Sequence, residues 1–328
     1  MYRIKQRPDD FIVEEIPKLE VLKKGDYTYF LLEKRNWNTL EAIKAIAASL
    51  KVKEGRFNIA GIKDKKAVSR QYISAYRINR NKLESLKIKD LSVTVLGYGD
   101  DRLRLGQLVG NRFKIVVRDV EKKVKPIAFI ENYFDDQRFG GKNSLLGKAL
   151  VQKEYRKACY TLRLRWSGSD YIAPLRTLGK RLLRFYINSY QSLLFNEAIA
   201  GWLAGLPGEK WTVDYTRGCF VFHKDRPPSK VFPIVGFLTE YPTKDVETIY
   251  KKILEKENIA KEAFLMRQIP ELNSEGNARE AIVPIKEMSI HYKKEDNFYL
   301  AEVQFMLPPG SYATVVIKKL FGTKNPPS

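Results

Sequence analysis

Cysteine and histidine are scarce in this chain of 328 residues, which contains two of each. Cys159 and Cys219 are too few for a disulfide framework, and reduced thiols fit a cytoplasmic protein. His223 and His291 lie far apart in the sequence, and neither has a second ligand at metal spacing. The sequence therefore predicts no structural metal, and each histidine is expected to be a surface or hydrogen-bonded side chain.

A hydrophobic run long enough to cross a membrane is also missing. The nearest candidate, residues 185–208, is interrupted by one charged and several polar side chains: Glu197, Asn188, Ser189, Gln191, Ser192 and Asn196. Such a segment predicts a buried helix rather than a membrane span. The N-terminal residues are charged where a signal peptide needs an apolar region. These absences favour a cytoplasmic protein that acts away from membranes, and we expect a monomer.

Acidic residues are outnumbered, with 38 Asp and Glu against 59 Lys and Arg, and the net charge is +21. Residues 1–134 contain 29 basic and 17 acidic residues, and residues 135–184 contain 12 and 4. The remainder is close to neutral, at −1 for residues 185–282 and +2 for residues 283–328. Since Lys and Arg displace counterions from phosphates, a nucleic acid is the expected partner, bound mainly by the first half of the chain.

Hydrophobic periodicity predicts mixed helical and strand structure. Asn38 opens a capping-box pattern, so a helix is expected to follow it to about residue 50. Residues 57–60 and 72–76 read as strands, and alternation from Phe113 to Val117 predicts another that opens at Asn111. Further helices are expected at residues 152–164, 185–203 and 244–258. Near the end, a strand at 302–306 and a turn at 308–310 precede a helix that Ser311 is expected to cap.

The most informative stretch is residues 58–71, NIAGIKDKKAVSRQ, in which a single carboxylate, Asp64, lies among four cations: Lys63, Lys65, Lys66 and Arg70. Nearby opposite charges favour the ionised carboxylate. Gly61 is expected to let the backbone bend ahead of Asp64. The flanking strands place Asp64 on a loop in a basic field, and a solvated surface turn is the plain alternative.

This segment resembles the signature loop of the TruD family of RNA pseudouridine synthases. Four further blocks resemble the family in the same order: RPDDFIVEE (7–15), LVGNRFKIVVR (108–118), NYFDDQRFGG (132–141) and LPPGSYATVVIKKL (307–320). Together the five blocks span nearly the whole chain. One departure is Tyr312, where some relatives have phenylalanine.

The resemblance implies an α+β fold. Residues 1–134 and 283–328 are expected to form a pseudouridine synthase catalytic core, a mixed and mainly antiparallel sheet with flanking helices. Residues 135–282 are expected to form the inserted α/β domain of the family. The change in charge near residues 185 and 283 gives partial support to this division.

The resemblance also implies a role for individual residues. Asp64 matches the catalytic nucleophile. The positions around the target uridine are matched by Phe11, Asn111, Phe113 and Tyr312, with rings that stack on or flank the base and an amide that binds it. Without the motif, Phe11 and Phe113 are core residues and Asn111 is a turn residue. Lys5 is an auxiliary candidate for orienting Asp64, and the candidates for RNA-backbone contacts are Lys63, Lys65, Lys66 and Arg138.

The function implied is isomerisation of uridine to pseudouridine in RNA, at uridine 13 of tRNA, with Asp64 and no cofactor. Other structured RNA is a further possible substrate. One alternative is a non-catalytic RNA-binding or RNA-remodelling protein that retains the fold, against which the intact Asp64 loop argues. A nucleotide-dependent enzyme such as a methyltransferase lacks support, because Gly97-Tyr98-Gly99 is not followed by a phosphate-binding glycine pattern.

Overall fold

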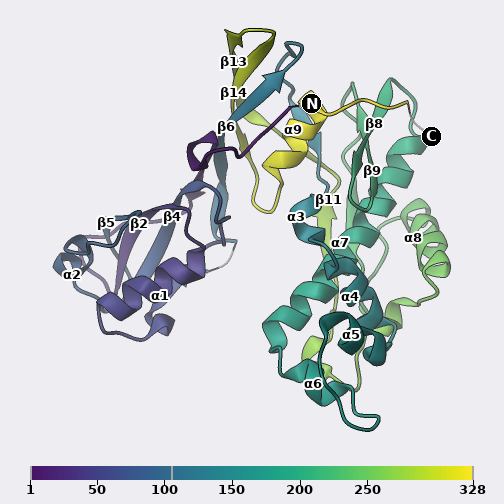
Figure 1. Ribbon diagram of the computed structural model, residues 1–328, viewed down its shortest axis with the longest axis horizontal. Coiled ribbons are helices and arrows are strands. Elements are labelled where there is room, and N and C mark those ends of the chain that lie inside the picture. Colours follow the sequence, from purple (N-terminus) through teal and green to yellow (C-terminus); the bar gives the residue numbers. More distant parts are fainter. Residues whose placement is uncertain (1, 105, 327–328) are drawn as a thin grey trace. The chain divides into compact units, whose positions relative to one another are not determined.

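The structure is a computed structural model, and it describes residues 2–104 and 106–326. The chain divides into two compact units, which can be followed by colour in Figure 1. Unit 1 comprises Met1–Ala128 and Pro284–Ala313, and unit 2 comprises Phe129–Val283 and Thr314–Ser328. Each unit is described by itself.

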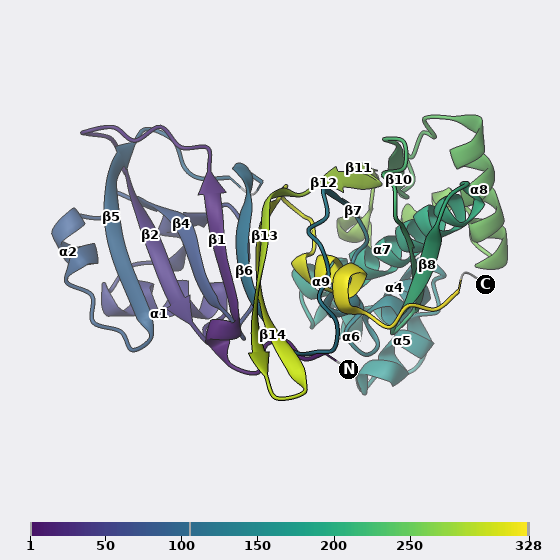
Figure 2. The same ribbon diagram turned by 90° about the horizontal axis from the view of Figure 1, so that it is seen from above.

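Unit 1 is built on one eight-stranded sheet with the order β13-β14-β6-β1-β4-β2-β5, in which β3 also pairs with β4. Figure 2 shows β5, β2, β4, β1 and β6 side by side, with the β13/β14 hairpin next to β6. The pair β1/β4 is parallel and the other pairs are antiparallel. The strands are β1 (Phe11–Pro17), β2 (Tyr27–Arg35), β3 (Phe57–Ile59), β4 (Val68–Tyr76), β5 (Leu91–Gly99), β6 (Leu108–Val120), β13 (Lys286–Glu295) and β14 (Phe298–Leu307).

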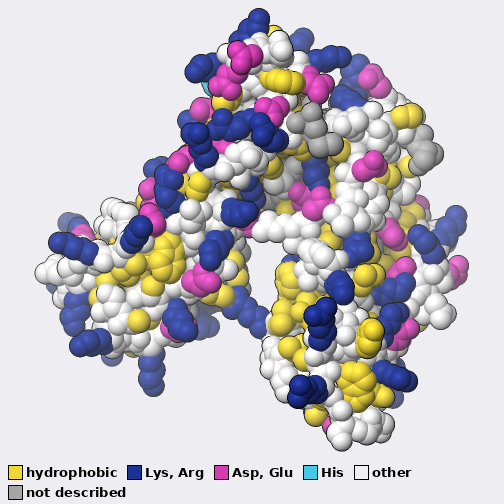
Figure 3. Space-filling model, in the orientation of Figure 1, with side chains coloured by type: hydrophobic (Ala, Val, Ile, Leu, Met, Phe, Trp, Pro, Cys, Tyr) yellow, Lys and Arg dark blue, Asp and Glu magenta, His cyan; other side chains and the backbone are white. Residues whose placement is uncertain are grey.

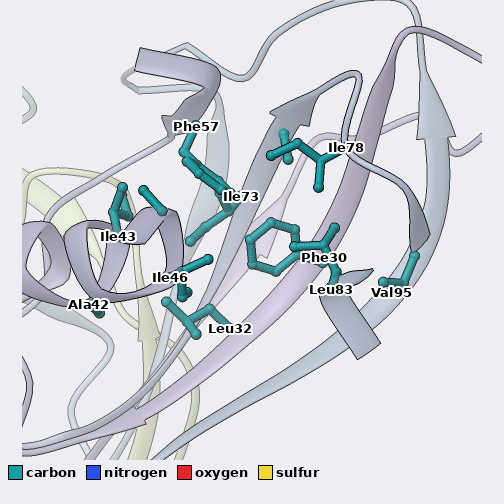
Figure 4. Close-up of a cluster of buried hydrophobic side chains, with 12 residues drawn as sticks. Phe30, Leu32, Ala42, Ile43, Ile46, Phe57, Ile73, Ile78, Leu83 and Val95 are labelled. Atoms are coloured by element: carbon teal, nitrogen blue, oxygen red, sulfur yellow. The ribbon is translucent and has the colours of Figure 1, made fainter. Parts of the chain in front are cut away.

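Helix α1 (Thr39–Ser49) covers part of this sheet, and the short α2 (Arg80–Glu84) adds to the same core. Asn38 caps α1 as expected, since its side chain accepts a hydrogen bond from the Leu40 N–H. Figure 4 shows Ile46 of α1 next to Leu32 of β2, and Ile43 in the same cluster of buried side chains. At the start of α1, Thr39 Oγ1 accepts a hydrogen bond from the Lys63 N–H at 2.9 Å, which ties the helix to the chain beside Asp64.

Unit 2 is organised around the long helix α7 (Lys180–Gly205). Its buried polar side chains are hydrogen-bonded, for example Gln191 Nε2 to the Val235 carbonyl at 2.6 Å and Asn196 Nδ2 to the Phe134 carbonyl at 2.8 Å. The expected buried helix is therefore confirmed. Among residues 2–104 and 106–326, no helix is long and apolar enough to cross a bilayer.

Shorter elements surround α7 within unit 2. The helices are α3 (Asp136–Phe139), α4 (Asn143–Val151), α5 (Tyr155–Leu162), α6 (Ile172–Arg176) and α8 (Lys244–Lys256), and α9 (Ala313–Phe321) lies almost wholly in this unit. Two-stranded sheets are formed by β8 (Lys210–Tyr215) with β9 (Gly218–His223), β10 (Val231–Ile234) with β11 (Asn277–Glu280), and β7 (Phe129–Glu131) with β12 (Ile282–Pro284).

Three local predictions need correction. Strand β6 begins at Leu108 rather than Asn111, because Leu108 already pairs with Pro17 of β1. The helix expected at 152–164 begins only at Tyr155, since α4 runs to Val151 and Lys153 has a left-handed φ of 61°. The hydroxyl of Ser311 is buried and has no hydrogen-bond partner among the described residues, so it does not cap α9.

The compact units also divide the chain differently from the predicted boundaries. Residues 129–134 and 314–328 were assigned to the catalytic core, but they group with unit 2. The reason is a set of ion pairs with α9: Lys319 Nζ lies 2.9 Å from Glu131 Oε2, and Lys318 Nζ lies 2.7 Å from Asp135 Oδ1. The division into a catalytic core and an inserted domain stays a prediction.

Candidate active site

Asp64 lies on the loop between β3 and β4, as predicted. Its Oδ2 atom lies 2.9 Å from Lys5 Nζ, and the two side chains are 29% and 21% exposed, respectively. The same ammonium group lies 4.2 Å from the centre of the Phe11 ring. Lys5 therefore links Asp64 to Phe11, as expected for a residue that orients the carboxylate, although 59 positions separate Lys5 from Asp64.

The main chain at Asp64 is held by Lys34, a completely buried lysine of β2. Lys34 Nζ donates hydrogen bonds to the carbonyls of Asp64 (2.9 Å) and Trp37 (2.6 Å). Burial lowers the pKa of Lys34 from 10.5 to about 8, and the Asp64 carboxylate opposes that shift. Lys34 therefore fixes the position of Asp64 through its backbone.

Replacing Lys34 with methionine tests this support. Methionine fills a similar volume but donates no hydrogen bond, and we expect turnover to fall about 10- to 100-fold as Asp64 loses its position. Because the folded-state pKa is below the unfolded value, the cost of holding the charged amine is present below pH 8 and disappears towards pH 10.5. Between pH 8 and pH 10.5, the free energy of unfolding of the wild type should therefore rise by roughly 3 kcal/mol relative to that of Lys34→Met. Denaturant unfolding at several pH values measures this change, and a constant difference would contradict it.

A buried ion pair lies under the same loop. Lys63 Nζ is 2.7 Å from Glu15 Oε1, and the two side chains are 10% and 0% exposed. Glu15 also accepts a hydrogen bond from the Tyr72 N–H at 2.9 Å. Lys63 is therefore paired inside the fold, and its assignment as an RNA-backbone contact stays a prediction.

The glycine at position 61 acts differently from what was expected. Its φ angle is not in the left-handed region, so a tight bend does not require glycine there. A Cβ at Gly61 would instead lie 3.2 Å from Lys63 Nζ and 3.3 Å from Glu15 Oε1. The glycine leaves room for the ion pair.

Phe11, Phe113 and Asn111 lie on one buried face of the sheet. In the β1/β6 pair, Val13 is opposite Phe113 and Glu15 is opposite Asn111. The Phe11 and Phe113 rings are 6.2 Å apart in a T-shaped arrangement. Both rings are nearly buried, at 5% and 7% exposure, so they also belong to the core of unit 1. The structure thus joins Asp64, Lys5, Phe11 and Phe113 through successive contacts.

Asn111 has an unused acceptor. Its side chain is 8% exposed, and its Oδ1 atom is buried with no hydrogen-bond partner among the residues that the structure describes. The preceding Gly110 passes so close to β14 that a Cβ would lie 2.6 Å from the Leu307 carbonyl oxygen. Since a buried orphan acceptor costs free energy, its persistence favours a ligand that donates to it.

Tyr312 follows the turn after β14. Leu307, the last residue of that strand, pairs with Asn111, and the chain reaches Tyr312 five residues later. The Tyr312 side chain is half-buried. The sheet register therefore brings the chain leading to Tyr312 beside Asn111.

The remaining candidate cations differ in exposure. Lys65 and Lys66 are exposed on the Asp64 loop, and Lys65 pairs with Glu41 at 3.5 Å. Arg138 belongs to unit 2, where its Nε donates to Ser192 Oγ at 3.0 Å and its guanidinium lies 5.6 Å from the Phe134 ring centre. Lys65 and Lys66 remain available for phosphate, whereas Arg138 already has partners in its own unit.

Sequence reasoning did not identify Lys34 or Glu15. Lys34 follows Phe30 and Leu32 at inward-facing positions of β2, and Glu15 follows Phe11 and Val13 in β1 in the same way. Both could have been identified as charged residues at inward-facing positions of a strand, where apolar side chains are expected.

The arrangement provides one carboxylate with a lysine partner, on a loop anchored from below. The described residues contain no group of three or more His, Cys, Asp or Glu side chains placed to hold a metal ion. A partly exposed carboxylate can attack an electrophilic carbon and later leave it. On β6, opposite Glu15, Asn111 offers a buried hydrogen-bond acceptor.

Comparisons with known proteins show which family the chain belongs to. The family model described as tRNA pseudouridine synthase D (TruD) matches residues 2–163 and 221–320. "Probable tRNA pseudouridine synthase D" of Methanococcus vannielii is 29% identical, over 97% of this chain and 95% of that protein. "tRNA pseudouridine synthase D" of Aquifex aeolicus is 28% identical, over 97% and 98%.

A solved structure shares the fold. A crystal structure named as that of the "Putative tRNA pseudouridine synthase D (TruD)" from Methanosarcina mazei matches with a TM-score of 0.68 and 24% identity, covering 97% of this chain and 93% of that one. The sheet and flanking helices of unit 1 are consistent with the pseudouridine synthase fold that was expected. The chain belongs to the TruD family of tRNA pseudouridine synthases, which are isomerases.

Proposed function

We propose that this protein converts a uridine of tRNA, uridine 13, to pseudouridine, with Asp64 as the nucleophile and without a cofactor. The observation that carries the proposal is the Asp64 carboxylate 2.9 Å from Lys5 Nζ, on a loop that Lys34 anchors. Family membership supports the reaction type. The net charge of +21 supports binding of RNA, because Lys and Arg displace counterions from phosphates.

The reaction breaks the bond between ribose and N1 of uracil, turns the base and joins ribose to C5. No group is imported and nothing is oxidised. A single carboxylate suits this task because it can add covalently and leave again. Hydrolysis of a glycosidic bond needs a second carboxylate to activate water, which this reaction must exclude.

The other side chains are assigned to holding the base. Asn111 Oδ1 is a buried acceptor without a partner in the described part of the chain, and uracil offers one N–H donor at N3. The rings of Phe11, Phe113 and Tyr312 are proposed to flank the uracil during its rotation. Lys65 and Lys66 are proposed to contact phosphates and offset the cost of extruding the nucleotide.

The position of modification tests the proposal. The protein is incubated with a transcript of a tRNA and with the same transcript carrying cytidine in place of uridine 13. Pseudouridine should appear at position 13 of the first and nowhere in the second. Pseudouridine at other positions of both transcripts would reject uridine 13 as the target but retain pseudouridine formation as the activity. If neither transcript were modified, the proposed function would be rejected.

Tyr312 provides a finer test of base stacking. Replacing Tyr312 with alanine should lower turnover by about 5- to 150-fold, the equivalent of about 1–3 kcal/mol of stacking, and leave the melting temperature nearly unchanged. Tyr312→Phe should be close to wild type, because the ring is retained. Steady-state turnover and thermal unfolding of both variants measure these effects. A well-folded but inactive Tyr312→Phe would give the hydroxyl a chemical role and overturn the stacking assignment.

A further inference from the structure

Helix α5 and the loop after it expose two aromatic rings on unit 2. Tyr160 near the end of α5 is 77% exposed, the highest value for a large hydrophobic side chain in the described part of the protein. Trp166, in the following loop, is 37% exposed, and its ring lies 5.7 Å from that of Tyr171. The Trp166 indole therefore packs against Tyr171 while part of it stays exposed to solvent.

The same segment is strongly basic. Residues 153–165 contain five Lys and Arg and one acidic residue, Glu154, which pairs with Lys157 at 2.7 Å. Arg156, Arg163 and Arg165 are exposed and form no ion pair with any described residue. Figure 3 shows hydrophobic side chains next to Lys and Arg at the end of unit 2 that carries α5 and α6. A ligand with both aromatic and negative groups matches this surface.

Two open hollows meet at these rings. One, of about 470 Å³, is lined by Lys142, Tyr160, Thr161, Arg163, Leu164 and Trp166. The other, of about 670 Å³, is lined by Glu154, Arg156, Lys157, Tyr160 and Trp166. Both volumes are within the range of small-ligand sites, roughly 300–1,000 Å³. Each hollow therefore has space for a flat ring beside at least one unpaired arginine.

We propose that this surface, formed by Tyr160, Trp166, Arg156 and Arg163, binds an unpaired segment of RNA, with bases stacked on the two rings and phosphates on the arginines. Stacking on an aromatic face accepts any base, whereas bases within a duplex have no free face to offer. The inference deepens the proposed function, on which it rests for the choice of RNA. It adds a binding surface on unit 2 to the catalytic site of unit 1.

Substitutions separate stacking from charge. The probe is a short fluorescent oligouridylate, compared with an RNA duplex of equal length, and the protein is the full chain. Tyr160→Ala and Trp166→Ala should each weaken oligouridylate binding by about 5- to 150-fold. Trp166→Phe keeps a ring, so it should retain affinity while losing part of the quenching of tryptophan fluorescence that the oligonucleotide causes in the wild type.

Arg163 can be replaced without straining the backbone, so it tests the contribution of a single charge to RNA binding. Its φ is 55°, a conformation that glycine adopts more readily than arginine, so Arg163→Gly should leave the fold intact. The variant should bind oligouridylate more weakly, and the slope of log affinity against log salt should decrease by about one. Matched controls are Phe298→Ala, which removes a 41% exposed ring from β14, and Lys252→Ala, which removes an exposed charge from α8. Both should bind as the wild type does.

The binding measurements distinguish unpaired RNA from duplex RNA and from an anionic membrane as the partner of this surface. Wild-type affinity in Tyr160→Ala and Trp166→Ala would overturn the proposal, as would equal dependence of duplex binding on the two rings. Ring-dependent binding to anionic phosphatidylglycerol vesicles, without ring-dependent RNA binding, would assign the surface to a membrane instead. Pseudouridine formation is measured in parallel. Ring-dependent oligouridylate binding by a protein that makes no pseudouridine would reject the proposed function and retain this surface.

Discussion

Asp64→Asn is expected to abolish pseudouridine formation while leaving tRNA affinity within about twofold of wild type. The amide keeps the shape of the side chain but cannot act as a nucleophile, and loss of a nucleophile commonly costs more than roughly 10³-fold in turnover. Binding should persist, because the phosphate contacts do not involve this carboxylate. Nucleoside analysis of the product and a tRNA-binding titration measure the two quantities.

Stability provides the control for this variant. Asp64 and Lys5 are 29% and 21% exposed, so the lost ion pair should cost less than about 1 kcal/mol of unfolding free energy. The backbone contact from Lys34 is retained in Asp64→Asn. Substantial turnover by a verified preparation of this variant would remove Asp64 from the catalytic role.

Phe113→Ala is expected to have the second large effect, on both stability and turnover. Phe113 is 7% exposed, and its ring packs 6.2 Å from Phe11 and 5.5 Å from Phe305. Truncating a buried phenylalanine typically costs about 3–5 kcal/mol, because a cavity remains. Thermal and denaturant unfolding should report this loss, and a fall in turnover of Phe113→Ala alone would not separate stacking from unfolding.

Phe113→Leu separates the two roles. Leucine preserves most of the volume, so its stability cost should stay below about 1.5 kcal/mol, but it removes the aromatic face. If the ring stacks on uracil, turnover of Phe113→Leu should fall about 5- to 150-fold at nearly native stability. Phe305→Leu is the matched control, a buried ring in the same cluster with no proposed contact to the base. Equal turnover in the two variants would assign Phe113 to the core alone.

Local patterns were sufficient for the elements that carry the site. The alternation of Phe113, Ile115 and Val117 correctly predicted a strand with one buried face. The helix after Asn38 and the two strands around Asp64 were also found, because capping and periodicity act over a few residues. The family blocks implied that Asp64 and Phe11 share one site, with Lys5 as an auxiliary candidate outside the blocks, and in the structure Lys5 contacts both residues.

Long-range partners were not predictable from these patterns. The four cations nearest to Asp64 in sequence suggested its ionic surroundings, but Lys63 pairs with Glu15 and Arg70 pairs with Glu33. The Asp64 carboxylate lies 2.9 Å from Nζ of Lys5, which is distant in the sequence. Ion pairs form between residues that the sheet brings together, so distance along the sequence is a poor guide to them.

The unit boundaries illustrate the same limit. The family resemblance implied a boundary near residue 134 and assigned the end of the chain to the core, with charge counts that change only near residues 185 and 283. In the structure, Lys318 and Lys319 of α9 form ion pairs with residues of unit 2. Lys319 and its partner Glu131 are 188 positions apart. Charge counts within a segment carry no information on such pairs.

Tritium release from tRNA labelled at C5 of uridine tests the central claim most directly. Joining ribose to C5 expels the C5 hydrogen, so the wild type should release one tritium for each pseudouridine formed, and Asp64→Asn should release none. The proposed mechanism predicts equal amounts of released tritium and pseudouridine in reactions without added nucleotide or metal. Tritium released in excess of pseudouridine, or released by Asp64→Asn, would contradict it.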